Sequence, residues 1–401
     1  MLSFDDVLEA ENIIRDKLHR TPIFHSETFS DMFNADVYFK METFQKTGSF
    51  KTRGALVKFA SLTHEEKKNG VITASAGNHA QGVAYAGHYY NVDAKIVMPE
   101  ATTPAKINAV EYYGGHAILH GKSYDEAHDY AVKLGKKEKR TFIEAYNDER
   151  VIAGQSTIGK EIMDDLNPDI IVVPIGGGGL ISGVAFAAKN MDNNVKIIGV
   201  ESEKANSMDL SIRENRIVPY TSNDTIADGM AVKYPGDITF SYVKKYVDNI
   251  VTVSDENIAY ALFKILEREK VLVEPSGATG LAALMENKID VKNKKVVIVL
   301  SGGNINFLLL SNIIYKSLER EDKLIRIQFK LPDHPGIMVK IVNAISSVGA
   351  NIYHAEVDNL KKDTEIGYQN LLFTINIVDK ERINDLLNSI NKLGYKYSII
   401  D

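Results

Sequence analysis

The chain has 401 residues, of which 44% are hydrophobic and 25% charged, and its formal net charge is −6. This length suits two or three domains of about 100–200 residues each, and the composition is typical of a globular protein. With no basic excess to neutralise a phosphate backbone, nucleic acid is not expected as the main partner. The absence of cysteine excludes disulfides, thiolate catalysis and cysteine-based zinc sites.

Targeting and membrane signals are not expected in this chain. The N-terminal stretch MLSFDDVLEA is acidic and lacks the long apolar core of a signal peptide. No apolar run approaches the ~20 residues that cross a bilayer. We therefore expect a cytoplasmic protein with no membrane partner.

Short β-branched runs alternate with helical patterns between residues 70 and 300. This alternation predicts βα units around parallel sheet and thus an α/β fold. The run DIIVVPI is apolar throughout, as expected for a strand covered by helices on both faces. The predicted strands cover residues 71–75, 94–99, 116–120, 141–145, 169–175, 196–200, 249–253 and 295–300.

The C-terminal part of the chain has a different pattern. Residues 324–331 alternate apolar and polar side chains, which predicts a strand with one exposed face. Residues 337–348 carry an apolar helical stripe, and strands follow near 350–358 and 370–378. A second helix and a closing strand complete a βαββαβ order, which predicts a ferredoxin-like module. The charged stretch 317–323 is interpreted as the link to it.

A run of four glycines lies between an apolar strand and an apolar helix, in IIVVPIGGGGLISGV. A flexible linker would not have such flanks. A strand, a glycine loop and a helix start together present free N–H groups and the positive end of a helix dipole. The run therefore predicts an anion site, most plausibly for phosphate.

A nicotinamide-binding site is the alternative interpretation of this run. Gly177, Gly179 and Gly183 have a related spacing, and Glu201 ends the next strand, where a dinucleotide-binding fold places its ribose-binding acid. Against this alternative, the run lies in the middle of the chain and leaves the remaining motifs without a role.

Two further strand ends are followed by polar turns, TASAGNHAQG (73–82) and VIVLSGGN (297–304). The first helical turn after Gly77 offers amides that can hold a carboxylate, although Asn78 acting as a simple helix cap would also explain the first stretch. Ligands of open α/β sheets bind beyond the carboxyl ends of the strands. We therefore expect these two turns and the glycine run to converge on one crevice.

Lys51 lies in the stretch GSFKTRG, residues 48–54. Taken alone, it is interpreted as an exposed charge. In a chain with a phosphate site and a carboxylate site, however, a lysine is the group that forms a Schiff base with an aldehyde cofactor. A cofactor that carries both a phosphate and an aldehyde is pyridoxal phosphate.

The motifs GSFKTRGA, SAGNHAQG, GGGGL and SGGN, in this order, resemble those of fold-type II pyridoxal-phosphate enzymes, and among these the threonine dehydratases (threonine ammonia-lyases). The resemblance covers about residues 5–320, and residues 331–352 resemble an ACT regulatory domain. It implies a catalytic domain over 1–320 made of two parallel-sheet, three-layer αβα subdomains, the smaller inserted at about 50–147. It also implies one ACT module over 324–401.

The resemblance assigns roles to individual residues. Lys51 would bind the cofactor aldehyde, Phe50 would pack beside the cofactor ring, and Asn78 would hydrogen-bond the phenolic oxygen. Ser301 would face the pyridine nitrogen and, as a hydroxyl, would leave that nitrogen neutral. The expected phosphate-binding residues are Gly176, Gly177, Gly178, Gly179 and Leu180, and the expected substrate-binding residues are Ser75, Ala76, Gly77, Asn78 and His79.

The implied reaction is the deamination of L-threonine to 2-oxobutanoate and ammonia, with L-serine giving pyruvate as a secondary activity. Lys51 would remove the α-proton before β-elimination of hydroxide. A serine racemase or serine dehydratase-type enzyme, or a non-catalytic amino-acid sensor, remains an alternative. Racemases carry a second base, a serine, where this chain has Ala76, and His79 departs from the TSGNT pattern of sulfur-transfer relatives.

The cation site of related racemases maps to Glu201, Ala205 and Ser207. Because Ser207 replaces the usual aspartate, we expect no divalent metal, although a monovalent cation remains compatible with the site.

The ACT-like module implies allosteric regulation by an amino acid, with isoleucine as the first candidate and a role in isoleucine biosynthesis as one option beside a catabolic one. The candidate effector contacts are Asp333, Gly336, Ile337 and Asn351. Because ACT modules pair side by side, a homodimer or homotetramer is expected.

Overall fold

The computed structural model describes residues 1–220, 224–359, 364–377 and 380–400. The chain divides into two compact units, Met1–Ile305 and Asn306–Asp401. The sequence placed this boundary after residue 320. The structure places it before helix α14 (Phe307–Arg320), because α14 packs against strand β11 (Leu324–Pro332) of the second unit.

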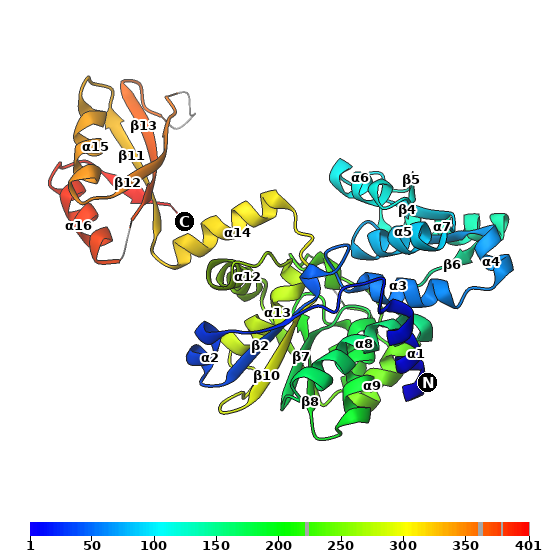
Figure 1. The fold of residues 1–401 in the computed structure, drawn as a ribbon. Coiled ribbons are helices and arrows are strands. Elements are labelled where there is room, and N and C mark those ends of the chain that lie inside the picture. Colours follow the sequence, from blue (N-terminus) through cyan, green and yellow to red (C-terminus); the bar gives the residue numbers. More distant parts are fainter. Residues whose placement is uncertain (221–223, 360–363, 378–379, 401) are drawn as a thin grey trace. The chain divides into compact units, whose positions relative to one another are not determined.

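The first unit contains a six-stranded sheet with the order β1-β2-β10-β7-β8-β9 (Figure 1). All neighbouring strands are parallel except β1, which runs antiparallel to β2. Sequence analysis assigned no strand before residue 70, yet β2 pairs with β10 from the other end of the unit. The strands are β1 (Ile23–His25), β2 (Asp36–Met41), β7 (Ile170–Pro174), β8 (Lys196–Ser202), β9 (Asn249–Val253) and β10 (Lys295–Leu300).

A second, four-stranded parallel sheet has the order β5-β4-β3-β6. Its strands are β3 (Val71–Ala74), β4 (Ala94–Met98), β5 (His116–Leu119) and β6 (Thr141–Phe142). All of them lie within the segment 50–147 that the sequence assigned to a smaller subdomain. Strand β6 ends before the predicted residue 145, so the chain that follows is free to turn toward the larger sheet.

Helices cover the faces of both sheets (Figure 1). Side-chain caps start several of them, including Ser123 before α7, Asp148 before α8 and Ser254 before α12. The helices are α1 (Phe4–Ile14), α2 (Glu27–Phe33), α3 (Lys51–Ala60), α4 (His64–Asn69), α5 (Asn78–Tyr90), α6 (Pro104–Tyr112), α7 (Tyr124–Glu138), α8 (Glu149–Asp165), α9 (Gly179–Met191), α10 (Ser207–Glu214), α11 (Asp237–Tyr246), α12 (Asp255–Glu269) and α13 (Pro275–Met285), with short 3-10 turns η1 (Glu42–Phe44) and η2 (Asp228–Met230).

Helix α3, which begins at Lys51, packs against both α5 and α8. Its contact with α8 is close, because a Cβ atom added to Gly154 would lie 2.5 Å from the Cα atom of Gly54. On the other side, Leu56 and Phe59 join the apolar core shared with α5 and the smaller sheet. Gly54 of the GSFKTRG stretch therefore allows α3, the helix that carries Lys51, to pack closely against α8.

A buried cluster of ion pairs anchors the same helix. Arg53, fully buried, donates from Nε and Nη2 to the carboxylate of Glu42 at 2.8 Å each and from Nη1 to Glu161 at 2.7 Å. The Lys40 Nζ donates to Glu161 at 2.6 Å. The charges of two cationic and two anionic side chains thus cancel, and a buried charge needs such an oppositely charged partner. The cluster joins α3 to β2, η1 and α8.

The second unit has the element order β11, α15, β12, β13, α16, β14, which is the βαββαβ order that the sequence predicts. Its sheet is antiparallel with the strand order β12-β13-β11-β14. Ile327, Phe329, Ile341 and Phe373 are buried in its core. The remaining elements are α15 (Ile337–Ser347), β12 (Asn351–Val357), β13 (Tyr368–Asn376), α16 (Lys380–Asn391) and β14 (Tyr397–Ile399).

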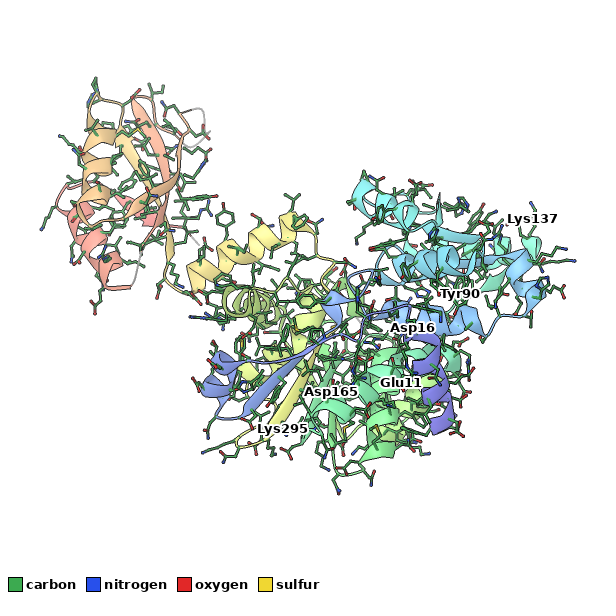
Figure 2. The ribbon with its side chains drawn as sticks, in the orientation of Figure 1. Glu11, Asp16, Tyr90, Lys137, Asp165 and Lys295 are labelled. Atoms are coloured by element: carbon green, nitrogen blue, oxygen red, sulfur yellow. The ribbon has the colours of Figure 1, made fainter. Side chains whose placement is uncertain are left out.

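Charged side chains populate the surface of the first unit (Figure 2). Lys137 is exposed near the end of α7, and Asp165 at the end of α8 pairs with Arg20 at 2.6 Å. Over the described residues, none of the helices combines the length and the apolar character needed to span a membrane.

Candidate active site

A cavity of about 1070 Å³ lies in the first unit, at the carboxyl ends of strands from both sheets. Ser75 follows β3, Gly176 follows β7 and Ser301 follows β10, and all three line this cavity. The structure thus brings together the three strand ends that the sequence expected to converge. Lys51 and Phe50 line the same cavity from the start of α3.

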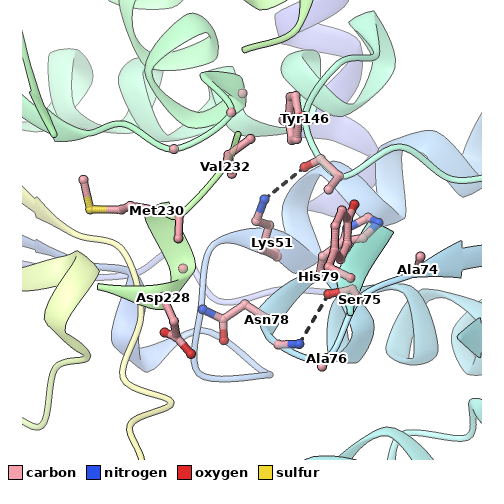
Figure 3. A pocket seen from close by; sticks show the side chains of 18 of the residues that line it. Lys51, Ala74, Ser75, Ala76, Asn78, His79, Tyr146, Asp228, Met230 and Val232 are labelled. Carbon is pink, nitrogen blue, oxygen red and sulfur yellow. Dashed lines mark hydrogen bonds between the residues drawn. The ribbon is translucent and has the colours of Figure 1, made fainter. Parts of the chain in front are cut away.

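The Lys51 amine points into this cavity, and its Nζ donates a hydrogen bond to the Ala145 carbonyl at 3.0 Å (Figure 3). It lies 5.1 Å from the centroid of the Phe50 ring. Burial lowers the pKa of Lys51 to about 8, against the opposing charge of Glu274. The neutral amine, which is the form that acts as nucleophile or base, is therefore far more populated near neutral pH than in an ordinary lysine.

The glycine run forms a tight loop between β7 and α9. Gly178 has a φ of 92°, which favours glycine, and α9 starts at Gly179. A Cβ atom on Gly177 would lie 2.4 Å from the ring of Tyr146, so a side chain there would collide with this wall of the cavity. The loop and the N-terminus of α9 bring backbone N–H groups to the cavity, an arrangement that can bind an anion.

The SAGNH turn connects β3 to α5. The Ser75 Oγ accepts a hydrogen bond from the Gly77 N–H at 3.3 Å. His79 is buried, with its Nε2 3.1 Å from both the Thr73 Oγ1 and the Ile143 carbonyl. Burial, with a contribution from Lys51, lowers the pKa of His79 to about 3, so the ring is neutral. The turn therefore offers hydrogen-bonding groups, and not a histidine charge, to a ligand.

Asn78 takes part in a hydrogen-bond chain that the sequence did not reveal. Its Nδ2 lies 2.8 and 3.0 Å from the two carboxylate oxygens of Glu274, and its Oδ1 accepts from the Asn304 Nδ2 at 2.7 Å. Burial raises the pKa of Glu274 to about 7, against the hydrogen bond from Asn78. Asn304 belongs to the quoted SGGN stretch, whereas Glu274 precedes Pro275 at the start of α13 and carries only the signal of a helix start.

Two more features of the cavity wall were not predicted. Tyr146 packs against the glycine loop, and its hydroxyl donates to the Tyr234 carbonyl at 3.1 Å. Lys106 of α6 pairs with Asp228 of η2 at 3.5 Å, which links the smaller subdomain to the larger one at the cavity.

Glu201 lies in the protein core and not in the cavity wall. Its carboxylate accepts hydrogen bonds from the backbone N–H groups of Met208 at 3.0 Å and Asp209 at 2.7 Å, at the start of α10. Burial raises its pKa to about 8. The nicotinamide alternative required this acid to reach a ribose beside the glycine run, so the structure contradicts it.

The residues mapped from the cation site of racemases make hydrogen bonds within the protein. The Ser207 Oγ donates to the Val232 carbonyl at 2.9 Å, and Ala205 closes a tight turn with Ser202. Within the described ranges, no group of three or more histidine, aspartate or glutamate side chains is placed to hold a metal ion.

The cavity fits a ligand with an aldehyde, a phosphate and a ring nitrogen. Lys51 has an amine that could bond to the aldehyde, and Gly177 and Gly178 leave a space at the cavity wall that a Cβ would fill. Ser301 supplies a hydroxyl in the wall, and the buried Ser276 hydroxyl has no hydrogen-bond partner in the described protein. A lysine, a glycine-rich loop at a helix start and available hydroxyls in one cavity are the groups expected in a pyridoxal-phosphate enzyme.

Comparison with known families gives the same class. The family described as "Pyridoxal-phosphate dependent enzyme" matches residues 14–302. The chain belongs to this family of enzymes, and pyridoxal 5′-phosphate is its cofactor.

Several individual proteins of known activity or structure are similar to this chain. The L-threonine ammonia-lyase of Thermotoga maritima is 42% identical over 401 residues, which is 100% of both chains. The structure of the processed form of threonine deaminase isoform 2 from Solanum lycopersicum has a TM-score of 0.75 and 40% identity, covering 78% of this chain and 87% of that one. Maize serine racemase has a TM-score of 0.74 and 36% identity, covering 79% of this chain and 98% of that one.

Proposed function

We propose that this enzyme is a threonine ammonia-lyase, which converts L-threonine to 2-oxobutanoate and ammonia. The observation that carries the proposal is the Lys51 amine, held in the cavity with a pKa lowered by burial to about 8. The full-length similarity to an L-threonine ammonia-lyase supports threonine as the substrate.

The residues around the cavity divide the binding task. When bound, pyridoxal phosphate supplies an aldehyde that bonds to the substrate nitrogen and a ring that withdraws electrons from Cα. The phosphate would be held by backbone N–H groups at the start of α9, from Gly176, Gly177, Gly178, Gly179 and Leu180. The Ser301 hydroxyl would donate to the ring nitrogen without protonating it, Phe50 would pack beside the ring, and Asn78 would donate to the phenolic oxygen.

Lys51 moves the proton. Its neutral Nζ takes the proton from Cα of the substrate, and the lowered pKa gives this amine a larger neutral fraction near neutral pH than an ordinary lysine has. Loss of the β-hydroxyl then gives an unsaturated amine, which water hydrolyses to the keto acid and ammonia. The same steps on L-serine give pyruvate as a secondary activity.

The SAGNH turn holds the substrate carboxylate. Backbone N–H groups at the start of α5 and the Ser75 hydroxyl are the donors, since His79 is neutral. Ala76 occupies the position where a racemase needs a second base, and a methyl group cannot carry a proton. We therefore favour elimination over racemisation, although a solved serine racemase is similar.

We further infer that the second unit is an ACT module that senses an amino acid. Its βαββαβ order supports this assignment. The candidate contacts Asp333, Gly336 and Ile337 lie between β11 and α15, where Gly336 has a φ of 86° and open space around it, and Asn351 starts β12. Isoleucine is the first candidate effector, acting through different affinities for two states of a homodimer or homotetramer.

A keto-acid assay tests the function. Purified enzyme loaded with pyridoxal phosphate is incubated with L-threonine or L-serine, with and without isoleucine, and 2-oxobutanoate, pyruvate and ammonia are measured. We expect 2-oxobutanoate from threonine and a change in its rate with isoleucine. Loaded enzyme that makes no keto acid from threonine would contradict the proposed activity, and D-serine as the main product from L-serine would favour the racemase alternative.

A further inference from the structure

The Asn78 side chain is held between two residues that come from distant parts of the chain. Asn78 starts α5, Glu274 precedes α13, and Asn304 follows β10. Three separate elements thus contribute to one continuous chain of hydrogen bonds at the cavity wall, and all three residues line the cavity.

The hydrogen bonds of Asn304 determine the orientation of the Asn78 amide, that is, which of its two end atoms is the oxygen and which is the nitrogen. The Asn304 Nδ2 donates to the Thr47 carbonyl at 2.8 Å and to the Asn78 Oδ1 at 2.7 Å. A backbone carbonyl can only accept, so the atom facing Thr47 must be the amide nitrogen. Its second hydrogen then points at Asn78, which must turn its oxygen toward Asn304.

Glu274 completes the assignment from the other side. Its carboxylate, when ionised, can only accept, and both of its oxygens lie within 3.0 Å of the Asn78 Nδ2. The two neighbours therefore demand the same orientation of Asn78, with Oδ1 toward Asn304 and Nδ2 toward Glu274. A flipped amide would set donor against donor on one side and oxygen against carboxylate on the other.

We propose that Asn304 and Glu274 are positioning residues, which lock the Asn78 amide so that its Nδ2 presents a hydrogen-bond donor to the cofactor. The proposal rests on the proposed role of Asn78 toward the phenolic oxygen and deepens it. Neither residue needs to touch the substrate, because each acts through Asn78.

Two glycines leave the space that this arrangement needs. A Cβ atom on Gly302 would lie 2.6 Å from a carboxylate oxygen of Glu274 and 3.2 Å from the Asn78 Nδ2. A Cβ atom on Gly48 would lie 2.8 Å from the Asn304 Oδ1. Gly303 donates its N–H to the Gly48 carbonyl at 2.9 Å. Gly48 of GSFKTRG and Gly302 of SGGN are thus explained by the two neighbours of Asn78.

Glu274→Gln is the main test because it conserves shape but replaces one acceptor by a donor facing the Asn78 Nδ2. We expect kcat/KM for L-threonine to fall about tenfold or more, as the loss of a hydrogen bond to a charged group predicts. In cofactor-free protein, the Kd for pyridoxal phosphate should rise, and the visible absorption band of the bound cofactor should shift, since its phenolic oxygen loses an ordered donor.

Glu286→Gln is the matched control. Glu286 also accepts a hydrogen bond from an asparagine, the Asn257 Nδ2 at 2.9 Å, but at the far end of α13 and outside the cavity wall. We expect this variant to change the melting temperature about as much as Glu274→Gln does, with kcat/KM and the absorption band unchanged. A purely structural role for Glu274 would make the two variants behave alike.

A double-mutant cycle with Asn78→Ala decides whether Glu274 and Asn304 act through Asn78. Once Asn78 is removed, Glu274→Gln and Asn304→Ala should cause little further loss in kcat/KM or in cofactor affinity. Asn78→Ser takes the place of Asn78→Ala in the cycle if the alanine variant does not fold.

Losses that multiply across the cycle, or a Glu274→Gln enzyme with wild-type kcat/KM and an unshifted absorption band, would overturn the proposal. The cofactor affinity and the absorption band separate it from the proposed function. Wild-type enzyme that binds pyridoxal phosphate but leaves threonine unchanged would refute the threonine activity, while these two readouts would still decide the role of Glu274 and Asn304.

Discussion

Two cationic side chains near the start of α3 have opposite surroundings. Lys51 faces a cavity and donates to one described acceptor, the Ala145 carbonyl. Arg53, two residues further on, is fully buried and donates to Glu42, Glu161, Thr21 and Thr157. The same helical turn thus carries one amine whose positive charge has little stabilisation and one guanidinium whose positive charge is fully paired with carboxylates.

This difference teaches how the enzyme keeps a reactive amine on a rigid support. An amine that must lose its proton benefits from few partners and from burial. The helix that carries it must nevertheless stay fixed, and the neutral ion cluster around Arg53 fixes it from the other side. Changes at the two positions should therefore fail in different ways, one in chemistry and the other in stability.

Lys51→Ala should show the largest effect. If this amine takes the α-proton as proposed, its removal should lower kcat for L-threonine by about 10²–10⁴-fold, while the melting temperature of the cofactor-free protein stays close to that of the wild type. Steady-state kinetics and thermal unfolding measure the two quantities. A Lys51→Ala enzyme that deaminates threonine at near wild-type rate would refute the assignment.

Arg53→Met should unfold more easily, because it leaves Glu42 and Glu161 buried without their main partner. Breaking a buried pair in this way costs about 3–5 kcal/mol of unfolding free energy. The control is Arg20→Ala, which breaks the exposed pair with Asp165 and should cost less than about 1 kcal/mol. Denaturant unfolding gives both values, and equal stability of the two variants would contradict the distinction.

The pH dependence of cofactor attachment reports the Lys51 amine directly. Only the neutral amine attacks an aldehyde, and its fraction rises tenfold per pH unit below the pKa and levels off above it. With the Lys51 pKa lowered to about 8, the attachment rate to cofactor-free protein should rise up to about pH 8 and then flatten. An ordinary lysine side chain, with a pKa of about 10.4, is the control. A rate that still rises tenfold between pH 9 and 10 would show that burial does not lower this pKa.

Ala76→Ser should produce the smallest effect. A serine hydroxyl at this half-buried position in the cavity wall would supply the second proton carrier that racemisation requires. We expect a low but measurable formation of D-serine from L-serine, with Ala76→Gly as the control that adds no hydroxyl. Chiral chromatography of the product gives the answer, and equal D-serine from both variants would argue against the interpretation of Ala76.

The sequence predicted the parallel strands well, because apolar β-branched runs between turns are a local signal. It did not predict β1 and β2, since these strands lie before the repeating pattern and β2 takes its place only through pairing with β10 at the other end of the unit. The assignment of α14 to the second unit was also missed. The packing of this helix on β11 is a tertiary contact, and the sequence of the helix itself does not show it.

For the site, the sequence predicted the residues that a short motif marks, including Lys51, the glycine loop and Ser301, and the structure places them around one cavity. It missed Glu274, whose partner Asn78 lies 196 residues away. It also gave no role to Arg53 and Asn304, although both stand in quoted motifs. Their importance depends on burial and on distant partners, which spacing along the chain does not encode.

The segment 145–148 connects the smaller subdomain to the larger one, and each of its residues holds something different. The Ala145 carbonyl accepts a hydrogen bond from Lys51, and the Tyr146 ring packs against the glycine loop. The Asn147 Nδ2 donates to the Asp237 carboxylate at 2.7 Å, and the Asp148 side chain caps α8. Removing or adding one residue here would shift all four connections at once. Anyone exchanging the smaller subdomain between relatives should therefore place the junction after residue 144, which leaves Ile143 with its partners in the smaller subdomain, and transfer residues 145–148 whole with the larger subdomain.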